Sequence, residues 1–183
     1  MSISQQGYRL SPEYVLMGLL YQHPRHGYEL HKRLMDEFGY IWHVSQSQTY
    51  NILNRLENQG FISSTSIEQD KLPSRRLLQL TVSGSQRFNE WLDTPTKCSV
   101  HAIRVEFITR LYFLRQTHPD KIEKVINAQI GEVVAGLNRL RNVHSDLSEG
   151  QPFNRLALEL RISLLNSILV WLDECRKEFL PVR

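Results

Sequence analysis

The sequence is poor in cysteine, and its two cysteines, Cys98 and Cys175, lie far apart and form no C-x-x-C pair. It contains no run of 18 apolar residues, which argues against a membrane-spanning helix. The first residues, MSISQQGYRL, lack the basic segment followed by an apolar segment that is typical of an export signal. These absences predict a protein of the reducing cytoplasm with no membrane partner.

Motifs for catalysis, cofactors and metals are also missing. Neither G-x-x-x-x-G-K-[ST] nor G-x-G-x-x-G occurs. Cys98 and His101 have no recognisable third orienting group or glycine-built oxyanion turn nearby. The histidines of the N-terminal part match no zinc-binding spacing: His23, His26, His31 and His43. We therefore expect no enzyme, no cofactor and no metal site.

A large excess of one sign of charge is missing as well. The formal net charge is +3, and residues 1–95 contain nine Lys/Arg and nine Asp/Glu. A nucleic-acid partner would therefore have to be met by local clusters of cations and not by an overall field.

The composition that remains is that of a globular protein. The chain has 183 residues, of which 41% are hydrophobic and 22% charged, enough for one domain of ordinary size or two small ones.

Two amphipathic helices are predicted before residue 40. Ser11-Pro12-Glu13 is typical of a helix start, with a serine N-cap and proline at the first helical position. The second helix begins near residue 28 and should end at Gly39. Its expected buried side consists of Tyr28, Leu30, Leu34, Met35 and Phe38.

The stretch SQSQTYNILNRLENQGFISS, residues 45–64, predicts a third helix with an unusual outer face. Ser45 and Gln48 have the S-x-x-Q spacing of a capping box. The apolar side comprises Ile52, Leu53 and Leu56, and the opposite side comprises Ser47, Asn51, Asn54 and Asn58. Because asparagine is a poor helix former, these amides raise two alternatives, an ordinary solvated face and a surface that contacts a partner.

A hairpin and a fourth helix follow. FISSTSI (61–67) and RRLLQLTV (75–82) are predicted strands, and the polar residues between them form a tip that contains proline. The next helix runs from Ser83 to about Asp93. Three helices, a hairpin with a basic tip and a helix form the plan of a winged helix-turn-helix, whose third helix enters the DNA major groove.

This plan assigns candidate contacts with double-stranded DNA. Asparagine amides can read a base edge, whereas hydroxyls and cations suit phosphates. For Tyr50, rim packing and a phosphate contact are equally compatible with the sequence, and for the wing arginines edge-strand protection is an alternative. The candidates are Ser45, Gln46, Ser47, Gln48, Tyr50, Asn51, Asn54, Arg55, Lys71, Arg75 and Arg76.

The segment DTPTK, residues 93–97, predicts a boundary between a winged-helix DNA-binding domain (1–95) and an all-helical dimerisation domain (96–183). The expected fold class is mainly α, because the hairpin is the only β-structure predicted. Helices are expected over 99–116, 119–147 and 152–180. The middle helix has a heptad seam and the last an apolar arc too wide for so small a domain to bury, which favours a homodimer. The candidate dimer contacts are Ile126, Ile130, Val133, Leu137, Leu140, Leu160, Leu164, Ile168, Trp171 and Leu172.

The run LSPEYVLMGLL…HGYEL…QTYNILNRLENQGFI…PSRRLLQLTVSG resembles the N-terminal domain of PadR-family transcriptional regulators. The helical remainder, with PTKCSVHAIRVEFITRL, looks like the virulence-activator type of C-terminal domain. The wing departs from the family pattern, because Leu72-Pro73-Ser74-Arg75-Arg76-Leu77-Leu78 replaces a Gly-Arg/Lys-Pro tip followed by aromatic residues.

The resemblance implies a homodimer on an inverted-repeat operator, more often a repressor than an activator. It also implies a small aromatic or lipophilic effector that releases the DNA, and DNA contacts by Tyr50 and the wing cations. The alternative is a winged-helix protein–protein adaptor without DNA binding, because a fold does not fix a function.

Overall fold

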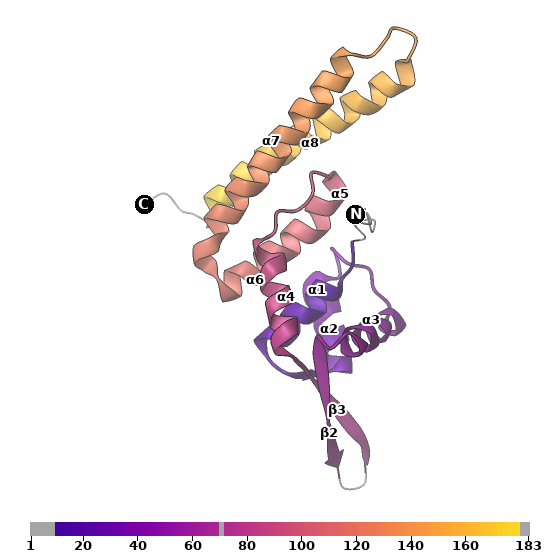
Figure 1. Cartoon of the computed structure of the whole chain (residues 1–183), viewed down its shortest axis with the longest axis vertical. Helices are drawn as coiled ribbons and strands as arrows, with labels where there is room; N and C mark the ends of the chain where they lie inside the picture. The colour runs from indigo at the N-terminus through magenta and orange to yellow at the C-terminus, as the bar shows by residue number, and fades with distance from the viewer. Residues whose placement is uncertain (1–9, 70–71, 180–183) are drawn as a thin grey trace, which may run out of the picture. The chain divides into compact units, whose positions relative to one another are not determined.

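The computed structural model describes residues 10–69 and 72–179. Its contacts divide the chain into two compact units, Met1–Thr94 and Pro95–Arg183, which are described separately. Figure 1 shows the elements of both. None of the helices among the described residues is long and apolar enough to cross a membrane.

The first unit is a winged helix. Three helices lead into a hairpin, and a fourth helix follows it; the hairpin extends away from the helices of its unit (Figure 1). The elements are α1 (Glu13–Gln22), β1 (Arg25–His26), α2 (Gly27–Phe38), α3 (Gln46–Asn58), β2 (Ile62–Gln69), β3 (Leu72–Leu80) and α4 (Val82–Asp93).

A small antiparallel sheet fixes the hairpin to the helices. Its strand order is β1-β3-β2, and β1 pairs with β3 through Arg25 opposite Leu78 and His26 opposite Leu77. The sequence predicted only a turn over residues 23–27, because two residues are too few to show a strand period. The pairing of β2 with β3 extends closer to the tip of the hairpin than predicted, since Gln69 still pairs with Leu72.

The core of this unit lies where the apolar sides of its helices meet. Two residues of the expected α2 core are instead exposed: Tyr28 by 61% and Met35 by 39%. The helical period places both beside the core, but the neighbouring elements do not reach them. The buried set from the four helices includes Val15, Leu16, Leu19, Leu30, Leu34, Phe38, Ile52, Leu53, Leu56, Phe88, Trp91 and Leu92.

The second unit is all helical within the described residues. The predicted helix over 99–116 contains a π-helical segment, and the helix expected from residue 119 begins with a 3-10 turn. The long helices α7 and α8 pack side by side as an antiparallel pair (Figure 1). The elements are α5 (Val100–Ala102), η1 (Ile103–Phe107), α6 (Ile108–Thr117), η2 (Pro119–Lys121), α7 (Ile122–Ser145) and α8 (Pro152–Phe179).

A buried polar network stabilises this second unit. The Arg110 guanidinium, which is fully buried, donates to the Glu106 carboxylate at 2.7 Å and to the Thr96 hydroxyl at 2.6 Å. The Gln129 amide pairs with the backbone of Thr96 through two bonds of 3.0 Å. Burial raises the pKa of Glu106, although Arg110 opposes this effect. Because buried polar groups need partners, the network specifies how the start of the unit packs on α6 and α7.

Candidate nucleic-acid interface

The capping box fixes the start of α3. The Ser45 hydroxyl accepts a hydrogen bond from the backbone N–H of Gln48 at 3.2 Å, and the Gln48 side-chain oxygen accepts one from the backbone N–H of Ser45 at 2.8 Å. Both bonds satisfy backbone donors that a helix start leaves unpaired. The capping box predicted from the S-x-x-Q spacing is thus confirmed.

The two sides of α3 differ as the sequence indicates. Thr49, Ile52, Leu53 and Leu56 are buried. On the other side, a row of polar residues reaches solvent from the first turn to the third. The exposed residues are Gln46, Ser47, Gln48, Tyr50, Asn51, Asn54 and Arg55.

The absence of a side chain at Gly27, the first residue of α2, leaves room for the Tyr50 ring. A Cβ atom on Gly27 would lie 2.9 Å from Cε1 of the Tyr50 ring, closer than carbon atoms pack. The ring therefore lies against the backbone of α2 and keeps 39% of its surface exposed. Rim packing and an accessible hydroxyl coexist in this arrangement, so both alternatives for Tyr50 that the sequence allowed remain open.

Two open concavities flank α3. One, of about 450 Å³, is lined by residues of the α2 start, α3 and β3, among them Tyr28, Tyr50 and Asn54. The other, of about 760 Å³, includes Trp42, His43 and Asn51 in its lining. The amides of Asn51 and Asn54 therefore border separate hollows on either side of the helix.

The cation of α3 is held by a carboxylate from α1. A terminal nitrogen of Arg55 lies 2.8 Å from Oε2 of Glu13, whose Oε1 is 2.5 Å from Arg87 of α4. The Arg87 guanidinium lies over the Phe61 ring, 4.4 Å from its centroid. Glu13 thus ties α3 and α4 to α1, a role that no sequence motif indicates.

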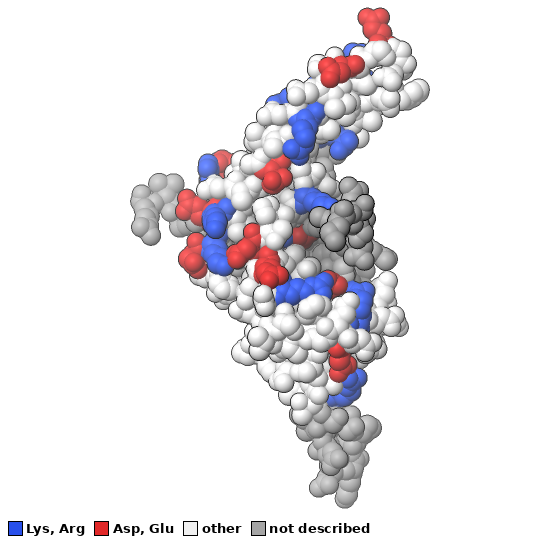
Figure 2. All heavy atoms as spheres, viewed as in Figure 1, with Lys and Arg blue, Asp and Glu red and all other residues white. Residues whose placement is uncertain are grey.

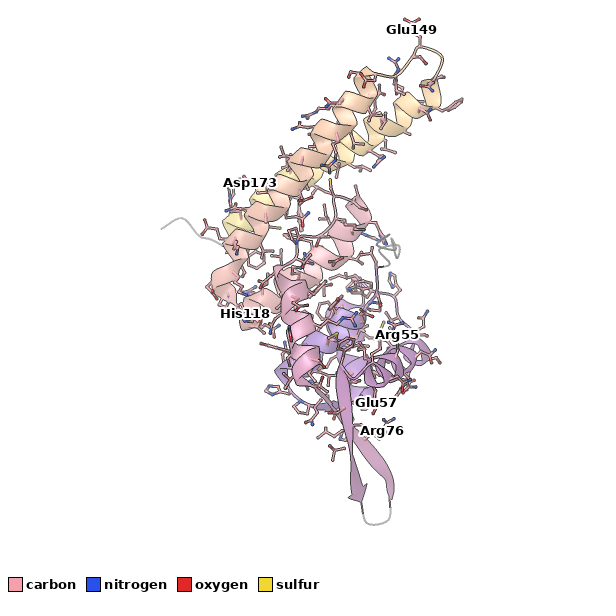
Figure 3. All side chains as sticks on the ribbon, in the orientation of Figure 1. Arg55, Glu57, Arg76, His118, Glu149 and Asp173 are labelled. Carbon is pink, nitrogen blue, oxygen red and sulfur yellow. The ribbon has the colours of Figure 1, made fainter. Side chains whose placement is uncertain are left out.

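At the base of the wing, Arg76 of β3 is also paired. Its guanidinium donates to both carboxylate oxygens of Glu57 at 2.6 Å and to the Ser64 hydroxyl at 2.9 Å. Figure 3 shows Glu57 and Arg76 together where the wing meets α3. The hydrogen bonds from Ser64 and Arg76 hold the pKa of Glu57 below its usual range.

The wing has two other candidate cations, Lys71 and Arg75. Lys71 lies outside the described residues, and so does the side chain of Arg75. Figure 2 shows basic and acidic side chains interspersed on the visible face, in keeping with the balanced charge of residues 1–95. Within the described residues, no group of three or more His, Cys, Asp and Glu could hold a metal ion.

The candidate dimer contacts occupy different environments in the second unit. Ile126, Val133, Leu137 and Leu172 are buried within the chain itself, where α7 and α8 pack together. Ile130, Leu140 and Ile168 are half-buried, as is Trp171, which packs edge-on against Phe107. Leu160 and Leu164 are exposed, and they continue a stripe that begins with Phe153 and Leu156. The heptad seam thus joins α7 to α8 of the same chain, and α8 has an apolar surface left over.

The first unit is therefore a winged helix that exposes the polar side of its third helix. Family models match both units: the transcriptional regulator PadR-like family matches residues 16–90, and the virulence activator alpha C-terminal family matches residues 103–179. Residues 16–90 therefore carry a PadR-like domain, and the members of the PadR family are transcriptional regulators and not enzymes.

The chain is also similar to individual known proteins. The chain is 27% identical over 136 residues to the negative transcriptional regulator PadR of Bacillus subtilis, which covers 74% of each chain. It is 29% identical over 84 residues to a probable transcriptional regulator of Mycobacterium tuberculosis, covering 46% of this chain and 44% of that one. The crystal structure of Bacillus subtilis PadR in complex with operator DNA aligns with a TM-score of 0.46 and 22% identity, covering 91% of this chain and 98% of that one.

Proposed function

We propose that this regulator binds operator DNA through α3 and the wing, as a homodimer, and represses transcription there. The exposed polar side of the capped helix α3 carries this proposal. The match of residues 16–90 to the PadR-like family supports it, and the Bacillus subtilis relative is named a negative regulator. Such a protein would act in the cytoplasm.

The residues of α3 divide into two roles. Asn51 and Asn54 would read base edges, because an amide presents both a donor and an acceptor, as adenine does in the major groove. The hydroxyls and amides of the first turn would contact phosphates and fix the register. The proposed contacts with the DNA phosphates are made by Ser45, Gln46, Ser47, Gln48, Tyr50, Arg55, Lys71, Arg75 and Arg76.

A second copy of the chain would cover the exposed stripe of α8. Phe153, Leu156, Leu160 and Leu164 follow one another at intervals of three and four residues, so they share one side of the helix. Phe153 is 84% exposed and Leu160 61% exposed, which is unusual for large apolar side chains that form one contiguous patch. A two-fold dimer would then present two α3 helices to half-sites about 34 to 36 Å apart, or a multiple of that distance.

Charge on this stripe tests the dimer. Leu160→Glu with Leu164→Glu should yield a folded monomer in sedimentation experiments, because the two carboxylates would have to be buried without partners. Asn166→Glu adds a carboxylate on another side of α8 and should leave the dimer intact. A double variant that stays dimeric at wild-type concentrations would place the dimer interface elsewhere.

We also propose that a small aromatic or lipophilic molecule releases the DNA. This rests on the family and on Bacillus subtilis PadR, which has been crystallised with p-coumaric acid. Titration of the protein–DNA complex with p-coumaric acid should lower the bound fraction. A bound fraction that does not change would exclude this acid as the effector.

Gel shifts with genomic fragments test DNA binding itself. At low salt, discrete complexes should form with a subset of fragments, and at moderate salt that subset should persist while the others dissociate. Absence of any complex at either salt concentration would favour the adaptor.

A further inference from the structure

Three residues form a closed hydrogen-bonded cluster where the wing joins α3. Glu57 comes from α3, Ser64 from β2 and Arg76 from β3. The Ser64 hydroxyl donates to Oε1 of Glu57 at 2.7 Å, and Arg76 donates to both Glu57 oxygens and to Ser64. We call Glu57, Ser64 and Arg76 the wing strut, since each member contacts the other two; Figure 3 labels Glu57 and Arg76.

The sheet register brings the two wing residues to the same place. Ser64 lies opposite Leu78, and Arg76 lies opposite Ser66, so Ser64 and Arg76 are diagonal neighbours on adjacent strands. On the other side of β3, the carbonyl oxygen of Arg76 lies 2.9 Å from Nδ1 of His26 at the start of α2. Arg76 therefore contacts both α3, through Glu57, and the start of α2, through His26.

The strut adds little to the stability of the fold. The side chain of Glu57 is 26% exposed and that of Arg76 is 52% exposed, so water screens their attraction. One terminal nitrogen of Arg76, Nη2, contacts both carboxylate oxygens and the Ser64 hydroxyl, and Ser64 in turn donates to Glu57, so the three side chains restrict one another's orientation. The cluster is thus better suited to fixing an angle than to holding the unit folded.

We infer that Glu57 is a positioning residue for DNA binding: it fixes the wing at the angle at which the wing and α3 contact one duplex together. Arg76 then serves the carboxylate of Glu57 and not a phosphate, which changes the role proposed for it above. This inference rests on the proposed function, because an angle between wing and helix matters only if both contact the same DNA.

Removal of Glu57 separates this inference from simple electrostatics. Glu57→Ala deletes a negative charge from a surface that would face phosphates, so Coulomb forces alone predict tighter binding. Loss of the strut predicts weaker binding, because the free wing has to be ordered when DNA binds. The two explanations therefore predict opposite changes in the DNA affinity of Glu57→Ala.

The experiment uses the full-length chain and a duplex that the wild type selects from a random pool. We would measure the dissociation constant over a series of salt concentrations for Glu57→Ala, Arg76→Ala and the double variant. Each single variant should bind about fivefold more weakly, the effect of roughly 1 kcal/mol, and the double variant should bind no more weakly than either. Glu37→Ala removes a carboxylate paired with Arg33 inside α2 and should bind like the wild type.

The salt dependence shows whether wing contacts are lost. Each phosphate contact that disappears lowers the slope of log K against log salt by about 0.9. The slope should fall equally in Glu57→Ala and Arg76→Ala, which a general loss of stability would not produce. Glu57→Gln keeps a hydrogen-bonding side chain that can reach Ser64, so it should restore part of the affinity.

Several results would overturn the inference. Glu57→Ala could bind as tightly as the wild type or more tightly, with the slope reduced only in Arg76→Ala, which would make Arg76 a direct phosphate ligand. If the wild type selects no duplex, the proposed function fails and the inference fails with it. If the wild type selects a duplex and Glu57→Ala binds it normally, only the inference fails.

Discussion

The exposed asparagines of α3 allow a prediction in which stability and recognition separate. Asn51→Ala and Asn54→Ala remove amides that reach solvent, so no packing is lost in the unit. Alanine is the better helix former, and each variant should change the free energy of unfolding by about 0.5 kcal/mol or less, towards greater stability.

DNA recognition should respond in the opposite direction. A well-formed contact between an asparagine and an adenine edge contributes about 1–3 kcal/mol of discrimination against the wrong base. The ratio of affinities for operator and scrambled duplex should therefore fall by about 5- to 150-fold in each variant, since 1.4 kcal/mol corresponds to tenfold. Fluorescence anisotropy with both duplexes at one fixed salt concentration measures this ratio.

The matched control is Asn58→Ala. Asn58 is exposed like the other two, but it is the last residue of α3, and a recognition helix contacts bases with its N-terminal residues. This variant should keep the wild-type affinity ratio. An unchanged ratio in Asn51→Ala and Asn54→Ala would refute base reading by α3, and an equal fall in Asn58→Ala would show that the loss is not specific.

Three further predictions concern the frame that holds α3 and the wing. Ser45→Ala removes the N-cap of α3 and should lower the free energy of unfolding by about 1 kcal/mol, seen as a lower melting temperature; an unchanged melting temperature would argue against the cap. Gly84→Ala would place a Cβ atom 2.0 Å from the Phe61 carbonyl oxygen, so α4 would have to shift. This shift should lower the free energy of unfolding, measured in urea, by about 1–3 kcal/mol. The control Gly131→Ala, with open space around the Cβ position, should not lower it. The pKa of Glu57 is lowered from 4.5, so its ionised form stabilises the folded state above that pH, and this contribution is lost as the pH falls through the folded-state pKa. Glu57→Gln should therefore lose less stability than the wild type on acidification below pH 4.5. Identical acid-unfolding profiles of the two proteins would contradict the pairing of Glu57.

Local sequence signals were sufficient to predict α3. The Ser45–Gln48 capping box depends on spacing alone, and the buried side of α3 follows from the helical period. Gly60, with φ of 74°, ends this segment in the left-handed conformation that glycine adopts easily. Signals of this kind involve residues within a turn of each other, so no tertiary information is needed to read them.

Features that depend on distant segments could not be predicted in this way. The ion pairs of Glu13 with Arg55 and of Glu57 with Arg76 join residues 42 and 19 positions apart. The heptad pattern of α7 shows that the helix packs against another helix, but not that this helix is α8 of the same chain. Tyr28 and Met35 lie at the edge of an apolar side whose width the sequence does not fix.

Selection of duplexes from a random pool, with the wild type and with Asn51→Ala side by side, tests the central claim most directly. We predict that the wild type enriches an inverted repeat whose half-sites are about 10 base pairs apart, or a multiple of that, and that the variant relaxes one position in each half-site. No enriched sequence, or a motif without symmetry that Asn51→Ala leaves unchanged, would contradict a dimer that reads DNA with α3.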